Sequence, residues 1–322
     1  APVQPPFPYP VQLYNPATNQ GYGYAAGGPT TPGGSSNTTI VQRIEYANDT
    51  ATAAVKGPLS LDRKNHSASG NINYGYNAGG HINPGFTATS STDRIDYASD
   101  TSTATPKGTL TFSAATRQST SNTSYGWFGG GNPSPYTSKI DRLDFSNDTA
   151  TASPRGPLSS AKTSMGTAGN ASYGYWGGGT EGPSGLSTVN RIDYSSDTGT
   201  TPTKGPLSSA REALFGFGNS SYGYFGGDYP GSITTIDRID YSNDTATASV
   251  KGPLDEGRRS SGGVASASGY GYAMGGTPSS SPSTSSISRV EFANDTATAS
   301  PKGNLYINAT GFGAVSAGDN GL

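Results

Sequence analysis

Residues 238–254 read RIDYSNDTATASVKGPL, and close variants stand at 191–207 (RIDYSSDTGTTPTKGPL) and 142–158 (RLDFSNDTATASPRGPL). Six such phrases begin with Arg, then an apolar, an acidic and an aromatic residue, at Arg43, Arg94, Arg142, Arg191, Arg238 and Arg289. Their starts are 51, 48, 49, 47 and 51 residues apart, so the chain contains an internal repeat of about 49 residues. A period of this size is typical of solenoids, propellers and arrays.

A second phrase precedes each of the first ones. It reads Tyr-Gly-aromatic and ends in a Gly pair, and it begins at Tyr22, Tyr74, Tyr125, Tyr173, Tyr222 and Tyr270. No helix pattern follows these glycines, which excludes a phosphate-binding loop. We expect them to end a strand and reverse the chain at positive φ. The clearest pairs are Gly79, Gly80, Gly129, Gly130, Gly177, Gly178, Gly226 and Gly227.

Each unit has room for four short strands. They are a small-residue segment such as 164–170, the Tyr-Gly phrase, the Arg phrase ending in an Asp-Thr turn, and a stretch such as 149–158. Short strands with turn signals every 8–12 residues indicate an all-β fold. Four strands in a repeat of this length predict the blade of a β-propeller, here with six blades.

The two ends of the repeat region predict how the ring closes. The first unit starts at its second strand, at Tyr22, and the C-terminal stretch YINATGFGAVSAGDN (306–320) aligns with the start of a unit at 159–173. The C-terminal strand should therefore complete the first blade and close the ring, leaving no exposed inner edge. We assign residues 21–322 to the propeller and residues 1–20 to an N-terminal arm.

Alternation along the Arg phrase predicts its packing. Ile239 and Tyr241 point to one face and should form core between blades, while Arg238 and Asp240 point to the other. Buried charges must be paired, so we expect this Arg and Asp to pair across the opposite interface, at every blade. The corresponding acids are Asp96, Asp144, Asp193 and Asp240. Pro154 and Pro301 fit an outermost strand, because an edge tolerates a missing N–H.

Composition excludes several classes of function. The formal net charge is −2, which gives no reason to expect nucleic acid as a partner, and the short apolar runs predict no membrane insertion. There is no cysteine. His66 and His81 have no metal-ligand spacing and fit turns or loops, and DRIDYSNDT lacks the order of a calcium loop. We expect no catalytic residues, no metal and no cofactor.

Two features allow a contact with sugars. Ten Asn-X-Ser/Thr sequons are candidate glycan acceptors, although four of them are the repeated Asn-Asp-Thr turn and all could remain unmodified: Asn37, Asn48, Asn65, Asn122, Asn147, Asn170, Asn219, Asn243, Asn294 and Asn308. Trp127 and Trp176 stand just before glycines, where they either pack between blades or stack on a sugar.

The arm, APVQPPFPYPVQLYNPATNQ, has six prolines and carries the apolar residues Phe7, Tyr9, Leu13 and Tyr14. Proline-rich segments extend as polyproline II, and VQLYN (11–15) has the character of a strand that could add to a sheet edge of another subunit. We expect the arm to join copies of the chain to each other or to other proteins of a particle.

The Gly pairs and the apolar-acidic-Tyr phrases resemble kelch-like repeats over residues 21–322, although the tryptophan usual in the fourth kelch strand is replaced by Ala, Ser or Gly after each Asp-Thr. The wording SNDTATASPRGPLSSAK (146–162) resembles repeats in structural proteins of tailed phages, notably cyanophages. These resemblances imply a kelch-like propeller and an extracellular virion component.

We therefore expect a non-enzymatic structural and display protein, on a tailed-phage appendage or as a surface decoration. Its partners would be virion proteins bound through the arm, and host-surface glycans. Two alternatives stay open: a subunit of a secreted, glycosylated filament or surface layer, and a carbohydrate-binding propeller.

Overall fold

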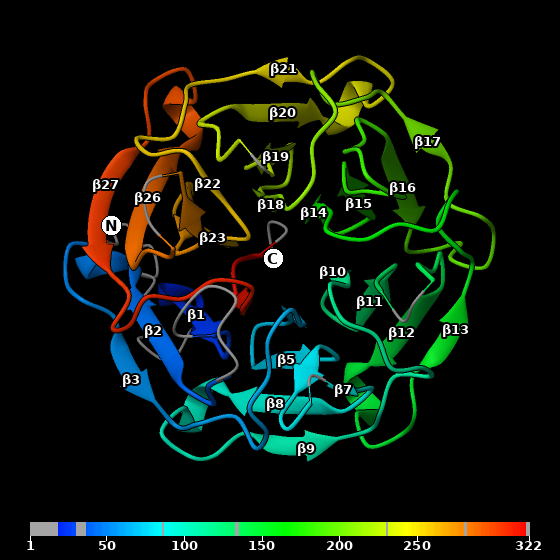
Figure 1. The fold of residues 1–322 in the computed structure, drawn as a ribbon, viewed down its shortest axis with the longest axis vertical. Helices are drawn as coiled ribbons and strands as arrows, with labels where there is room; N and C mark the ends of the chain where they lie inside the picture. The colour runs from blue at the N-terminus through cyan, green and yellow to red at the C-terminus, as the bar shows by residue number, and fades with distance from the viewer. Residues whose placement is uncertain are drawn as a thin grey trace, which may run out of the picture.

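The computed structural model describes residues 19–29, 37–85, 87–132, 135–229, 231–279 and 282–319. Six four-stranded antiparallel sheets surround a central axis like the blades of a propeller (Figure 1). This confirms the predicted all-β fold with six blades. The arm residues 1–18, including Phe7, Tyr9, Leu13 and Tyr14, lie outside the described residues.

Every blade uses its strands in the same order from the axis outward (Figure 1). The innermost strands, starting with blade 1, are β28 (Gly313–Ser316), β4 (Ser67–Gly70), β10 (Gln118–Ser121), β14 (Gly166–Gly169), β18 (Phe215–Gly218) and β23 (Gly262–Ser266). The second strands are β1 (Tyr22–Ala26), β5 (Tyr74–Ala78), β11 (Tyr125–Gly129), β15 (Tyr173–Gly177), β19 (Tyr222–Gly226) and β24 (Tyr270–Met274). The third strands are β2 (Val41–Glu45), β8 (Thr92–Asp96), β12 (Ile140–Asp144), β16 (Val189–Asp193), β20 (Ile236–Asp240) and β26 (Ser286–Glu291). The outermost strands are β3 (Ala54–Lys56), β9 (Thr105–Lys107), β13 (Ser153–Arg155), β17 (Thr203–Lys204), β21 (Ser249–Val250) and β27 (Ser300–Asn304).

Short elements complete the ring. Two small two-stranded sheets decorate it: the hairpin of β6 (His81–Ile82) with β7 (Thr87–Ala88), and the antiparallel pair of β22 (Arg258–Arg259) with β25 (Thr277–Pro278), which β23 and β24 separate in sequence. The short 3-10 helices are η1 (Asn19–Gly21), η2 (Tyr46–Asn48), η3 (Tyr97–Ser99), η4 (Phe145–Asn147), η5 (Tyr241–Asn243) and η6 (Phe292–Asn294). From η2 onward, each of these follows a third strand directly. No helix within the described part of the chain is long and apolar enough to cross a membrane.

The glycines after the second strands reverse the chain as expected, except for the first glycine of blades 3 to 5. Gly79 and Gly80 have φ of +72° and +88°. In blades 3 to 5 the first glycine, Gly129, Gly177 or Gly226, instead ends the strand, and the reversal starts at Gly130, Gly178 or Gly227. Packing favours glycine at these strand ends, because a Cβ on Gly129 would press on the indole of Trp176, and one on Gly177 would press on the ring of Phe225.

The ring closes as the sequence predicts. β28 pairs antiparallel with β1, from Gly23 opposite Ser316 to Ala26 opposite Gly313. The carboxylate of Asp319 then accepts hydrogen bonds from the backbone N–H groups of Ala265 and Ser316, both at 2.7 Å, and so ties the chain end to blade 6. Burial raises the pKa of Asp319 to about 7.

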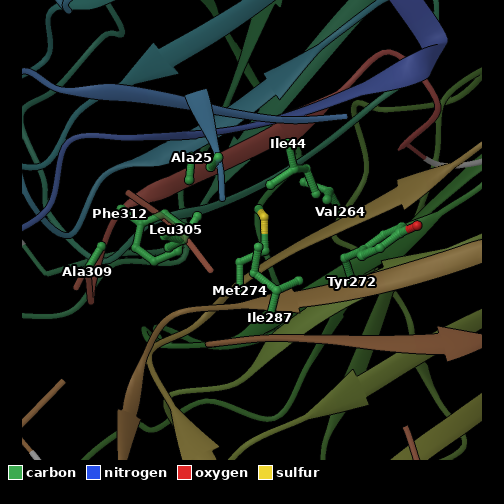
Figure 2. Close-up of a cluster of buried hydrophobic side chains, with 10 residues drawn as sticks. Ala25, Ile44, Val264, Tyr272, Met274, Ile287, Leu305, Ala309 and Phe312 are labelled. Atoms are coloured by element: carbon green, nitrogen blue, oxygen red, sulfur yellow. The ribbon is translucent and has the colours of Figure 1, made fainter. Parts of the chain in front are cut away.

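An apolar cluster seals the interface between blades 6 and 1 (Figure 2). Met274 lies between Ile287 below it and the Ala25–Ile44 side of blade 1, with Val264 and Tyr272 beside it. The chain ends thus meet through a packed core as well as through backbone hydrogen bonds. On the rim, Pro154 in β13 and Pro301 in β27 stand on outermost strands, which confirms the prediction made for them.

Candidate functional site

The residues of the Arg phrase meet at the interfaces between blades. At the interface of blades 4 and 5, Arg191 donates to Oδ2 of Asp244 at 2.8 Å and the hydroxyl of Tyr175 donates to the same oxygen at 2.9 Å. Nζ of Lys204 lies 3.2 Å from Oδ1. Asp244 is nearly buried, and its backbone carbonyl also accepts from the N–H of Gly205. One turn of blade 5 therefore holds the second, third and fourth strands of blade 4.

This inter-blade cluster recurs at all six interfaces. The acceptors are Asp49, Asp100, Asp148, Asp197, Asp244 and Asp295, each in the turn after the third strand. The arginines that donate to them are Arg289, Arg43, Arg94, Arg142, Arg191 and Arg238 of the preceding blade. The interface of blades 3 and 4 uses Trp127 in place of Tyr and Arg155 in place of Lys. Because the cluster also spans blades 6 and 1, it closes the ring electrostatically.

The partner predicted for these arginines was wrong. Arg238 binds Asp295 in the next blade, and Asp240 stays within its own blade, where Oδ1 accepts from the N–H of Ser242 at 2.9 Å. Asp96, Asp144 and Asp193 cap the start of the following turn in the same way. Asp240 ends the strand, so its side chain reaches the next backbone N–H groups before it can reach a neighbouring blade. Hydrogen bonds from Ser242 hold the pKa of Asp240 below its ordinary value.

Aromatic rings stack behind each cluster. Tyr175 and Tyr241 lie with centroids 4.9 Å apart and planes inclined by 10°. Equivalent stacks join Tyr24 to Tyr97, Tyr76 to Phe145, Trp127 to Tyr194, Tyr224 to Phe292 and Tyr272 to Tyr46. The apolar and aromatic residues of the Arg phrase thus form inter-blade core, as predicted, with the aromatic residue just past the end of the strand.

The two tryptophans are part of this packing. Both have no exposed surface. Nε1 of Trp127 donates to Asp197 at 2.9 Å, and Nε1 of Trp176 donates to the carbonyl of Gln118 at 3.0 Å. This burial contradicts the hypothesis that Trp127 and Trp176 stack on a sugar, because a ligand would have to separate the blades to reach either ring.

A second set of buried cations was missed by the sequence reasoning. Arg63 pairs with Asp93 at 3.3 Å, Arg117 with Asp141 at 3.1 Å, and Arg211 with Asp237. In blade 6, Arg258 lies 3.7 Å from Glu256 and donates to the hydroxyl of Ser288 at 2.7 Å. All four arginines are fully buried. The sequence signal for this set is the position of the cation after the leucine of the KGPL-type phrase. This position is not constant, because most of these cations follow the leucine by four residues, whereas Arg117 follows Leu110 by seven.

Blade 4 breaks this pattern. Lys162 takes the place of Arg, and Asn190 takes the place of the aspartate. Nζ of Lys162 is fully buried and has no hydrogen-bond partner among the described residues, and neither has Oδ1 of Asn190. Burial lowers the pKa of Lys162 to about 8.

The sequons fall into two groups by exposure. Those in the Asn-Asp-Thr turns, Asn48, Asn147, Asn243 and Asn294, are exposed, and so is Asn308. Asn37, Asn65, Asn122, Asn170 and Asn219 are partly buried. In Asn122, Asn170 and Asn219 the amide oxygen accepts from two backbone N–H groups of its own loop.

The two histidines differ in their surroundings. His66 is buried beside the closing strand, where Nε2 accepts from the N–H of Gly313 at 3.1 Å, and burial lowers its pKa to about 3. His66 lies in the connection just before β4, in keeping with the loop position predicted for it, but it is buried there, whereas His81 lies partly exposed in the β6–β7 hairpin. No group of acidic or His side chains that could hold a metal ion occurs within the described ranges.

The antiparallel blades place their connections on two opposite faces of the ring. One face, the loop face, carries the connections from second to third strands, and these vary most in sequence. The other, the turn face, carries the connections between first and second strands and the turns that hold the inter-blade aspartates. The axis between the faces is narrow, because Cβ atoms on Gly216 and Gly263 of the innermost strands would overlap backbone atoms of the neighbouring blade.

No protein-family model matches the sequence, and no curated protein matches it significantly. Among solved structures, the chain is similar to one titled "Structure of YjhT", with a TM-score of 0.69 and 9% sequence identity. The match covers 86% of this chain and 96% of that one. At this identity the likeness supports the propeller fold and carries no statement about activity.

Proposed function

We propose that the protein is a non-enzymatic structural component of an extracellular particle, in which a rigid ring displays the connections of its loop face. The observation that supports this most is the inter-blade cluster. The charged residues of the repeat phrase bind other parts of the ring at every interface, so the repeat serves rigidity, and variation is left to the loops.

The particle we favour is a tailed-phage virion, with the protein on an appendage or decorating the surface, because the repeat wording resembles such proteins. The arm would join the ring to copies of itself or to other virion proteins. Electron microscopy of the native source with an antibody against this chain tests the proposal. Label on tailed particles is the expected result, and label along free filaments would refute it.

The arm is tested separately by deleting residues 1–20. The shortened chain should keep the circular dichroism spectrum and melting temperature of the ring but sediment as a monomer. Assembly that survives the deletion would show that other surfaces hold the particle together.

A second candidate is a subunit of a secreted, glycosylated filament. It is favoured by the exposure of the four Asn-Asp-Thr sequons at equivalent corners of the ring. Intact-mass spectrometry of the native protein decides this point, since glycans at Asn48, Asn147, Asn243 and Asn294 would add heterogeneous mass.

A further inference from the structure

A recess of about 520 Å³ opens on the turn face between blades 5 and 6. The loop 218–222 of blade 5 forms one wall, and the equivalent loop 266–270 of blade 6 forms the other. Residues 291–293, at the end of β26 and the start of η6, lie along it, and Gly318 closes its axial end.

Blade 6 departs from the repeat at this recess. In blades 2 to 5 this loop starts with an asparagine, and in two of them its Nδ2 reaches the next blade, from Asn71 to the carbonyl of Thr123 (3.4 Å) and from Asn170 to that of Ser220 (3.3 Å). Blade 6 has Ser266 at this position and one additional residue in the loop. The loop turns at Gly269, whose φ is +94°.

One wall of the recess carries an asparagine amide. The amide oxygen of Asn219 accepts from the N–H groups of Ser221 and Tyr222, both at 2.8 Å, which fixes the orientation of the amide. Within the described chain its Nδ2 makes no bond of the kind that Asn170 makes to the next blade. Asn219 thus brings a half-buried amide with a donor to spare to the lining of the recess.

An acceptor stands on the opposite side. Blade 6 has Glu291 where blades 2 to 5 have the capping aspartates, and its exposed carboxylate caps nothing and pairs with no described residue. Ser220, Ser221 and Ser268 also line the recess, and the hydroxyl of Ser268 is hydrogen-bonded to that of Ser266 at 3.0 Å. The cations nearest in sequence, Arg238 and Arg289, are held by inter-blade aspartates.

Two tyrosines complete the lining. Tyr222 and Tyr270 are partly exposed, and the guanidinium carbons of Arg238 and Arg289 lie 4.1 and 4.3 Å from their ring centroids. The recess thus combines aromatic edges, hydroxyls, one amide donor and one carboxylate. Its volume lies in the range of about 300–1,000 Å³ that is usual for small-molecule sites.

We propose that this recess binds a neutral carbohydrate, whose hydroxyls would donate to Glu291 and accept from Asn219. The inference rests on the proposed display function, to which it adds a ligand class and a position on the ring. An apolar ligand would leave the amide and carboxylate without partners, which costs binding energy. An anionic sugar would be repelled by Glu291.

The test uses protein made in a bacterium, so that Asn219 carries no sugar of its own. Glucose, galactose, N-acetylglucosamine and the anionic N-acetylneuraminic acid are titrated by saturation-transfer NMR. At least one neutral sugar should bind saturably and the anionic one should not. Glu291→Gln should weaken binding about tenfold, as expected when a hydrogen bond to a charged group loses its charge. Ala293→Trp should fill the recess and abolish binding.

Blade 1 supplies matched controls at equivalent exposed positions. Glu45→Gln and Ala47→Trp should bind like the parent protein, because neither residue lines the recess. Absence of saturable binding for all three neutral sugars at about 50 mM, beyond the millimolar range of weak specific ligands, would overturn the proposal. So would binding that survives Ala293→Trp. These variants leave the arm intact, so they should assemble like the parent protein. Sedimentation therefore tests the proposed assembly separately from sugar binding.

Discussion

Replacing Lys162 by Met should stabilise the protein. The same substitution at the equivalent position of blade 5, Arg211→Met, should destabilise it. The ammonium group of Lys162 is buried without a partner, and burial lowers its pKa from 10.5 to about 8. Each unit of pKa shift corresponds to about 1.4 kcal/mol, so the buried charge costs about 3 kcal/mol of unfolding free energy at pH 7. Methionine has a similar length and volume and removes this cost.

The stability gained by Lys162→Met should decrease as the pH rises. An amine whose pKa is lower in the folded chain binds fewer protons when folded, so the unfolding free energy of the parent protein rises with pH between about 8 and 10.5. Below pH 8 the penalty is fully present, and the advantage of Lys162→Met is then greatest. Urea unfolding followed by the fluorescence of Trp127 and Trp176 measures both proteins from pH 6 to 10.

Arg211→Met is the matched control. Arg211 is buried against Asp237 in the equivalent slot of blade 5, so its removal leaves an uncompensated carboxylate and should cost about 3–5 kcal/mol. The reasoning would be refuted by a Lys162→Met protein that is less stable than the parent at pH 7. A stability difference that does not shrink toward pH 10 would refute it as well.

Three further comparisons test the ring. Asp244→Ala removes the acceptor of an inter-blade cluster and should cost about 3 kcal/mol, whereas Asp240→Ala removes a turn cap and should cost about 1 kcal/mol; chemical denaturation compares the two. Gly252→Ala would drive a Cβ into a backbone carbonyl of blade 6 and should lower the melting temperature by many degrees, while Gly182→Ala, which meets nothing within 4 Å, should leave it unchanged in calorimetry. Ending the chain before residue 313 removes the strand that closes blade 1, and limited proteolysis should then cut within that blade, where the full ring resists.

The sequence predicted the fold better than it predicted which side chains contact each other. The spacing of the Arg phrases gave the number of blades, and the unmatched segments at the two ends gave the closure by β28. The alternation of side chains along the strand correctly predicted that Ile239 lies in the core between blades, because successive side chains of a strand point to opposite faces. It could not show which element of the next blade faces Arg238, since that depends on how far the blades are rotated against each other.

The points that the sequence left open or missed have similar physical causes. For Trp127 and Trp176 it left two alternatives, and the structure shows packing between blades rather than stacking on a sugar, because the packing of neighbouring blades decides which side of a strand is covered. The second set of buried cations escaped notice because Arg117 reaches Asp141 from a different position in its unit than Arg63 and Arg211 use to reach theirs. Side chains from different positions of a repeat unit can occupy the same place in the fold, and an alignment of the repeats then does not reveal that they are equivalent.

The same reasoning indicates where function should be sought in a protein of this kind. Residues shared by all six units hold the ring together, as Asp244 and its equivalents do, so they are poor candidates for ligand contacts. A ligand site needs side chains that the repeat does not use, and these stand where one unit departs from the others. At Lys162 the departure lies inside the blade and affects stability. At Ser266, with its one additional loop residue, the departure lies on the surface beside a recess lined by Asn219 and Glu291, and a departure of that kind can be selected for binding.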